Sequence, residues 1–236
     1  MGRMRWVVLP SCLLLAACGG RGGGPGPTPR DYIDFVRVGG VTYYVADHGV
    51  GRPIDSGDLG PRFAVVRANP PTSGPPLAYR PRDGDAAYLA VGSPVFTVKG
   101  YHPSFRLAAG HHGRLHLYEA EEATGARTGA DLLDLAGKVR YLSVNSGRFE
   151  LARIKEAPRV AELVGQVLAA PVRPSDGRAE HRYCFVVFNL ADRTAVRRSF
   201  FPDTGQLAPG VFVPPSFTEA MEQALEAKGR RCGRTA

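Results

Sequence analysis

Apolar residues in the N-terminal half of the chain occur in short runs separated by Gly, Pro and Asp. The first two runs, residues 33–38 and 41–45, flank Gly39-Gly40, and a glycine pair between apolar runs is typical of a two-residue hairpin turn. Residues 51–60, 69–81 and 83–85 are rich in turn formers and are interpreted as loops. Further strand-like runs lie at residues 63–68, 95–99, 105–108 and 115–119. This spacing predicts a β-rich domain over residues 31–128, built as a small curved sheet or partial barrel.

The pattern changes at residue 129. A short helical segment at 130–136 is expected first, followed by two hairpins with strands at 139–144 and 149–154, and at 181–190 and 194–201. Each hairpin precedes an apolar stripe of helical period: Val160, Leu163, Val164, Val167 and Leu168 after the first, and Phe217, Met221, Ala224 and Leu225 after the second. Ser216 and Glu219 have the spacing of a capping box. The chain is therefore predicted to be α+β, with the order ββαββα in a second domain over residues 129–236.

The N-terminus has the pattern of a signal peptide over residues 1–17. Arg3 and Arg5 precede the apolar run Trp6 to Ala17, which is too short for the roughly 20 residues that span a bilayer. Residues 19–30 consist mostly of Gly and Pro, so they cannot bury an apolar face. We expect a tether with a typical span of about 20 Å between the membrane and a domain that begins near Asp31.

The tetrapeptide Leu15-Ala16-Ala17-Cys18 resembles the lipobox of bacterial lipoproteins. The resemblance implies that Cys18 is acylated and becomes the new N-terminus, so residues 18–30 form the lipidated cysteine and its tether. The implied location is the extracytoplasmic face of the cell membrane. A chance cysteine after an ordinary signal peptide is the alternative.

Residues 83–101 read DGDAAYLAVGSPVFTVKGY and are followed by FRLAA at 105–109 and LHLYE at 115–119. This stretch resembles one found in uncharacterised β-rich bacterial lipoproteins. It covers about forty residues of the first half. The resemblance implies a lipid-anchored, extracytoplasmic β-rich module and carries no catalytic residue.

Charge and composition narrow the classes of partner. Lys and Arg number 30 against 22 Asp and Glu, a basic excess that favours acidic partners, and the 44% apolar content excludes a wholly disordered chain. Nucleic acid is disfavoured by the expected compartment. A basic patch that suits a lipid or anionic polymer surface could be formed by five arginines: Arg173, Arg178, Arg182, Arg197 and Arg198. Ordinary solvated arginines are the alternative, because Asp176, Glu180 and Asp192 interrupt the series.

Two cysteines remain for a disulfide once Cys12 leaves with the signal and Cys18 is acylated. Cys184 and Cys232 are compatible with a bond in an oxidising exterior. A buried free Cys184 beside an unpaired Cys232 is the alternative.

His111, His112 and His116 provide three imidazoles within six residues. A bent hairpin could bring such donors to one metal ion. On a regular strand His112 and His116 would share a face but lie roughly 13 Å apart, so a solvated turn is the alternative.

No local catalytic signature is found in the chain. It has no G-x-S-x-G elbow, S-x-x-K, Walker loop or H-E-x-x-H. We therefore expect no cofactor and a non-enzymatic binding or regulatory module that contacts a membrane protein or a component of the cell envelope. Two alternatives stay open: an envelope hydrolase or its accessory domain, and a structural envelope lipoprotein.

Overall fold

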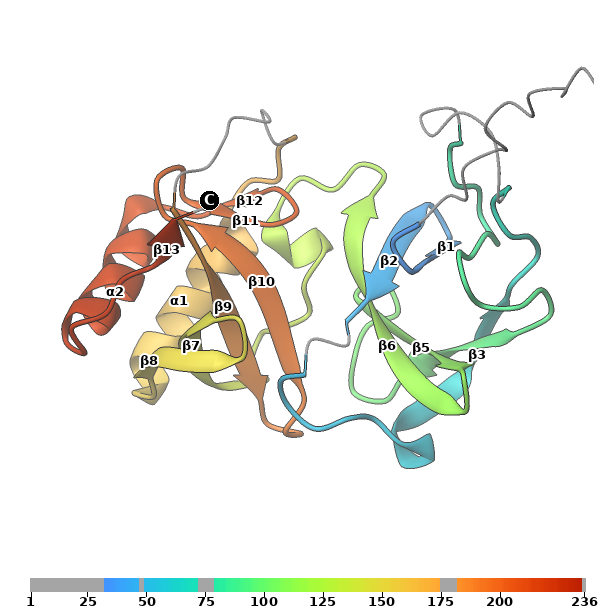
Figure 1. Ribbon diagram of the computed structural model, residues 1–236, viewed down its shortest axis with the longest axis horizontal. Helices are drawn as coiled ribbons and strands as arrows, with labels where there is room; N and C mark the ends of the chain where they lie inside the picture. Colours follow the sequence, from blue (N-terminus) through green and yellow to red (C-terminus); the bar gives the residue numbers. More distant parts are fainter. Residues whose placement is uncertain (1–31, 47–48, 72–78, 175–181, 235–236) are drawn as a thin grey trace, which may run out of the picture.

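Two antiparallel sheets lie side by side along the long axis of the molecule (Figure 1). The computed structural model describes residues 32–46, 49–71, 79–174 and 182–234. The N-terminal sheet has the order β1-β2-β6-β5-β4-β3 and curls as a half-barrel. Its strands are β1 Phe35–Val38, β2 Val41–Val45, β3 Leu59–Val65, β4 Pro94–Val98, β5 Arg106–His111 and β6 Arg114–Ala123. The 3-10 turn η1, Ser56–Asp58, precedes β3.

The turn between β1 and β2 is the one predicted from the glycine pair. Gly39 and Gly40 have φ angles of 60° and 78°, as a primed two-residue turn requires. The predicted start of the third strand at residue 63 is wrong, because β3 starts at Leu59, inside the segment interpreted as a loop. The pairing of β3 with β4 runs back to Leu59 and Val98, and this tertiary contact makes residues 59–62 extended although they include Gly60 and Pro61.

The C-terminal sheet has the order β12-β11-β10-β9-β7-β8, with β13 paired to β9. Its strands are β7 Val139–Ser146, β8 Phe149–Ile154, β9 Arg182–Leu190, β10 Ala195–Phe201, β11 Gln206–Leu207, β12 Val211–Phe212 and β13 Gly233–Arg234. Helix α1, Ala157–Ala169, follows the first hairpin, and α2, Pro215–Glu226, follows the second after β11 and β12. The broad α+β class is therefore confirmed. The short strands β11 and β12 were not predicted.

Helix α1 begins as the sequence indicates, because Pro158 lies in its first turn and Val160, Leu163, Val164 and Val167 are buried. The predicted capping box of α2 is wrong. The helix is capped at Pro214, so Ser216 already lies within its first turn, and no side chain caps the N-terminus. The helical segment expected at 130–136 is reduced to the 3-10 turn η2, Gly129–Asp131, because the next residues insert into the core.

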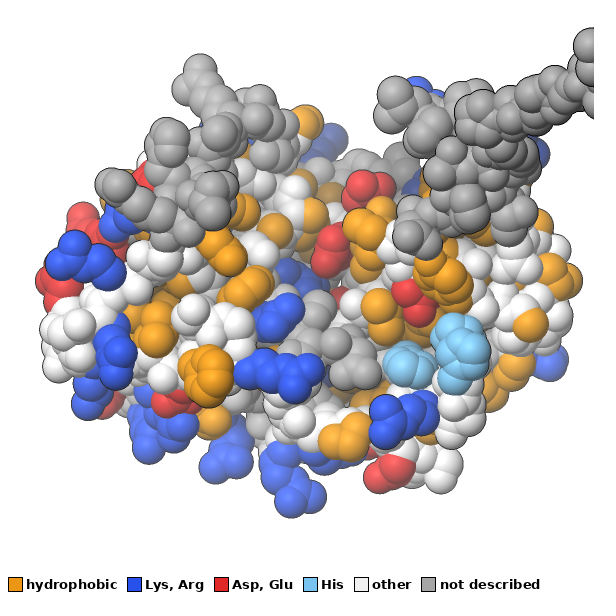
Figure 2. Space-filling view, in the orientation of Figure 1, with side chains coloured by type: hydrophobic (Ala, Val, Ile, Leu, Met, Phe, Trp, Pro, Cys, Tyr) orange, Lys and Arg blue, Asp and Glu red, His pale blue; other side chains and the backbone are white. Residues whose placement is uncertain are grey.

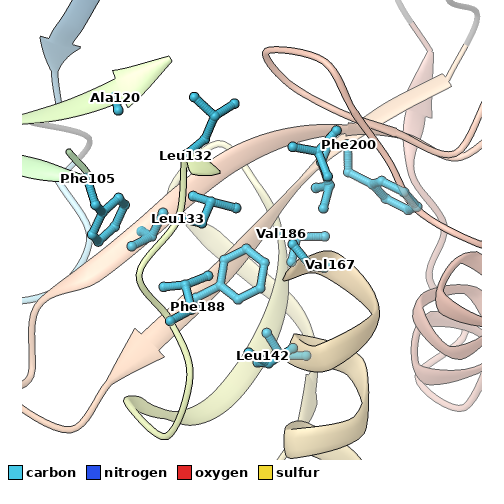
Figure 3. Close-up of a cluster of buried hydrophobic side chains, with 14 of the residues drawn as sticks. Phe105, Ala120, Leu132, Leu133, Leu142, Val167, Val186, Phe188 and Phe200 are labelled. Atoms are coloured by element: carbon cyan, nitrogen blue, oxygen red, sulfur yellow. The ribbon is translucent and has the colours of Figure 1, made fainter. Parts of the chain in front are cut away.

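One hydrophobic core connects the two sheets. Residues of the β5-β6 region, the segment after η2, the C-terminal sheet and both helices belong to a single buried cluster. Figure 3 shows Phe105 and Ala120 on one side, Leu132, Leu133 and Phe188 in the middle, and Val167 with Phe200 on the other. The predicted boundary between two domains thus passes through shared packing.

Candidate functional site

The predicted anchor lies outside the described residues, since these begin at Tyr32 and Cys18 precedes them. Within the described part of the chain, no helix is both long and apolar enough to cross a bilayer.

Cys184 and Cys232 are joined by a disulfide, with their Cα atoms 5.1 Å apart. The bond links the start of β9 to the segment before β13, and both cysteines are buried. It closes a loop with a sequence separation of 48 residues and fastens the C-terminal strand to the sheet.

The three histidines lie in the hairpin between β5 and β6. His112 occupies the turn with a φ of 49°, and the ring centroids of His111 and His116 are 6.2 Å apart. His111 and His116 share a face of the sheet, rather than His112 and His116, because the turn changes the register. Among the described residues no group of three or more His, Cys, Asp and Glu side chains is arranged to hold a metal ion. The predicted metal site therefore has no support in this geometry.

The predicted five-arginine patch is wrong for Arg198. Its side chain is buried and forms an ion pair with Glu119, because Arg198 shares the core-facing side of β10 with Val196 and Phe200. Arg182 is paired with Asp203 and Glu222, and Arg173 lies over the ring of Phe212. Arg178 lies outside the described residues. Of the set, Arg197 is on the opposite, outward side of the sheet.

Arg198 belongs to a buried ionic cluster between the two sheets. Glu119 of β6 accepts hydrogen bonds from Arg106 at 2.6 Å through one oxygen and from Arg198 at 2.7 Å through the other. Arg106 also donates to the hydroxyl of Thr194 and the carbonyl of Ala195 in the C-terminal half. These contacts tie β5 and β6 to β10.

Electrostatics in this cluster favour the charged carboxylate. Burial by itself would raise the pKa of Glu119, but the charges and hydrogen bonds of Arg106 and Arg198 outweigh burial and hold that pKa below its usual range. The cluster is closed to ligands, since Arg106 is 0% exposed and Arg198 is 3% exposed. Its role is to join the halves. The sequence carried a signal for it, because both arginines occur within apolar strand runs.

The outward side of the C-terminal sheet carries arginines next to aromatic rings. Strand alternation directs Leu142, Val186 and Phe188 to the helices and the neighbouring side chains outward. We call this outward surface the arginine-aromatic face and define it by Tyr141, Arg148, Arg153, Tyr183, Phe185 and Arg197. Sequence analysis missed all of these residues except Arg197.

Two arginines of the face stack on rings. The guanidinium carbon of Arg197 lies 4.3 Å from the ring centroid of Phe185, and that of Arg153 lies 4.7 Å from Tyr141. Such contacts fix the orientation of a guanidinium while its edge can still donate hydrogen bonds. Arg153 is also paired with Glu150.

Positive charges of the face lie close to one another. Burial, together with the nearby charge of Arg148, lowers the pKa of Arg197. Arg148 itself is exposed at the turn between β7 and β8 and lies against Gly49. Figure 2 shows Lys and Arg side chains gathered in the lower part of the C-terminal half, where Figure 1 places β7 and β8.

A groove of about 560 Å³ lies where the two halves meet and contains His102 and Ser104. The Nδ1 atom of His102 is 2.7 Å from the hydroxyl of Ser104 and also accepts a hydrogen bond from the Ser104 backbone N–H. Asp134 accepts a hydrogen bond from the backbone N–H of His102. The two His102–Ser104 contacts stabilise one turn before β5, and the contact with Asp134 joins that turn to the segment after η2, so all three contacts have a structural role.

Comparisons of the chain with protein-family models, curated proteins and solved structures gave no match.

Proposed function

We propose that this protein is a lipid-anchored, non-enzymatic binding module on the extracytoplasmic side of the cell membrane, and that it holds a negatively charged component of the envelope on its arginine-aromatic face. The location is supported by Arg3 and Arg5, the apolar run that follows them, and Cys18 at the end of a lipobox-like tetrapeptide. The Gly- and Pro-rich tether of residues 19–30 provides reach from the membrane anchor to that component.

The observation that carries the binding role is the stacked Arg197 beside Arg148. Phe185 holds the Arg197 guanidinium in place, so little side-chain freedom is lost when an anion binds. This fixed orientation favours an anion, and the exposed position of Arg148 leaves it accessible.

The test compares two double charge reversals on the full chain. Arg148→Glu with Arg197→Glu changes the face, whereas Arg62→Glu with Arg67→Glu makes the same change at exposed positions in and just after β3. Affinity for immobilised heparin, a defined polyanion, is the measured quantity. We expect the first variant to lose roughly tenfold or more, since an arginine near an anionic surface contributes about 1 kcal/mol.

The control pair should retain most of the affinity. Circular dichroism should show that both variants remain folded. Equal losses in the two variants would mean that net charge alone governs binding, and the proposed face would then be abandoned.

A further inference from the structure

Strand β8 forms one edge of the C-terminal sheet. It is the last strand in the order β12-β11-β10-β9-β7-β8 and pairs with β7 alone. Among the described residues, no backbone hydrogen bond joins the six residues of β8 to a segment other than β7. Figure 1 shows β8 at the outer margin of the C-terminal half. The N–H and C=O groups along such an edge can pair with a further strand.

A β-bulge makes the two halves of β8 chemically equivalent. The register of β7 with β8 skips Leu151, which is therefore an extra residue in β8. Glu150 and Arg153 pair with alternate residues of β7, so they share the outward side of the sheet although three positions separate them. Phe149 and Ile154 share the opposite side in the same way. Read from either end, the strand is apolar, charged, apolar, apolar, charged and apolar.

Two β8 strands can pair with each other in a register that uses this equivalence. When a two-fold axis passes between Leu151 and Ala152, Glu150 of each copy lies opposite Arg153 of the other. Opposite charges that face each other across an antiparallel pair are stabilising. Glu150 and Arg153 already form an ion pair at 2.7 Å within one chain, so the two copies together would contribute a network of four alternating charges.

The same register covers a protruding apolar side chain. Phe149 is 80% exposed, the largest value for a large hydrophobic residue among the described residues. Exposure alone assigns no partner, because single apolar side chains are common on protein surfaces. In this register, however, Phe149 of each copy lies opposite Ile154 of the other, on the side of the sheet away from the charges. Charged and apolar positions are thus matched at once.

A second copy fits this edge better than an arbitrary strand does. Bulges and charged side chains are devices by which edge strands avoid pairing. An arbitrary strand would leave Glu150 and Arg153 opposite unmatched residues and would not follow the bulge. A second copy carries the same bulge and the complementary charges, so the features that reject other strands favour this one.

We propose that β8 is a self-association edge, at which two copies of this chain pair antiparallel and join their C-terminal sheets into one. The edge is short, so we expect a weak dimer. This inference goes beyond the proposed function and does not rest on anion binding. Neighbouring antiparallel strands are related by an axis perpendicular to their sheet, so the arginine-aromatic faces of the two copies would point in the same direction.

The test is cysteine cross-linking of the full chain in intact cells. Two differently tagged copies are co-expressed, one with E150C and the other with R153C. Opposite residues of antiparallel strands have Cα atoms about 4.5–5.5 Å apart, which is within the range of a disulfide. After mild oxidation we expect a dimer that carries both tags. In the matched control R62C replaces E150C, because Arg62 is also exposed on a strand but lies in β3 of the other half, and its yield should be several-fold lower.

A charge reversal and its rescue test the register. Adding R153E to the E150C copy sets like charges opposite each other, because the R153C copy keeps Glu150. The yield of dimer should fall roughly fivefold. Adding E150R to the R153C copy should restore the yield, since opposite charges then face each other again. A restored yield also shows that the variants are folded.

The inference is overturned if the E150C and R153C copies cross-link no better than the R62C control. It is equally overturned if cells that contain E150C alone give as much dimer, because two copies of that position do not face each other in the proposed register. A charge reversal that lowers the yield without rescue would show that charge matching does not set the pairing, and it too would overturn the inference.

Discussion

Glu119 lies between two arginines in a place that water does not reach. Its carboxylate is 1% exposed and takes Arg106 on one oxygen and Arg198 on the other. Removing one partner of such a group leaves uncompensated charge in a medium of low dielectric, which is far more costly than losing a surface pair. The position of this single residue thus affects the whole interface between the sheets.

Glu119→Gln should strongly destabilise the protein. Two buried guanidinium groups would lose their counter-ion, and we expect the free energy of unfolding to fall by about 3–5 kcal/mol. Urea denaturation followed by circular dichroism measures it. Glu162→Gln, which removes the partner of exposed Arg159 on α1, should cost less than about 1 kcal/mol.

The difference in stability between the native protein and E119Q should depend on pH. Because the pKa of Glu119 in the folded protein lies below its ordinary value of 4.5, its contribution to stability is present above pH 4.5 and is lost as the pH falls through the folded-state pKa. The difference between native protein and E119Q should therefore shrink in strongly acidic solution. A difference that stays constant with pH would contradict this assignment.

At the scale of elements, α1 and the β1-β2 hairpin were predictable because their signals are local. Helical period and Pro158 specify α1, and two glycines specify the turn. The start of β3 and the short strands β11 and β12 depend on pairing with neighbouring strands, so no local sequence pattern predicts them. The capping box at Ser216 failed because a proline before the helix defined the start instead.

Two glycines near α1 should respond in opposite ways to the same substitution. A Cβ on Gly129 would lie 2.1 Å from the carbonyl oxygen of Val167, so Gly129→Ala must displace η2 from the helix. We expect a loss of about 1–3 kcal/mol in the free energy of unfolding. Gly165 is exposed within α1 with nothing within 4 Å of an added Cβ, and Gly165→Ala should stabilise by about 0.5–1 kcal/mol. Thermal and urea denaturation check both signs; a neutral Gly129→Ala would show that η2 is not packed tightly on α1.

At the scale of the molecule, side-chain hydrogen bonds, a backbone hydrogen bond and core packing all cross the predicted domain boundary. Arg106 reaches Thr194, Tyr101 donates to Asp192, and the backbone N–H of Val172 donates to the carbonyl of Arg127 within the boundary segment. Both sheets also contribute to one core. We therefore expect the halves to unfold together.

Native-state hydrogen exchange tests this expectation. The slowest amides of β5 in one half and β9 in the other should open with the same free energy, and E119Q should lower both equally. Limited proteolysis should spare residues 124–129. Earlier opening of β5 while β9 stays protected would instead establish two independent domains.

The sequence by itself determined the features that rest on local patterns: the signal-like N-terminus, the lipobox-like tetrapeptide, the Gly- and Pro-rich segment that follows it and the α+β class. The tertiary structure decided which charged residues are buried and which gather on a surface. Arg197 and Arg198 are adjacent in the chain, yet alternation along β10 sends one to the arginine-aromatic face and the other to the ionic cluster. The partners of these side chains, Glu119 and Phe185, come from other strands, and strand pairing brings them together over sequence separations that local patterns do not encode.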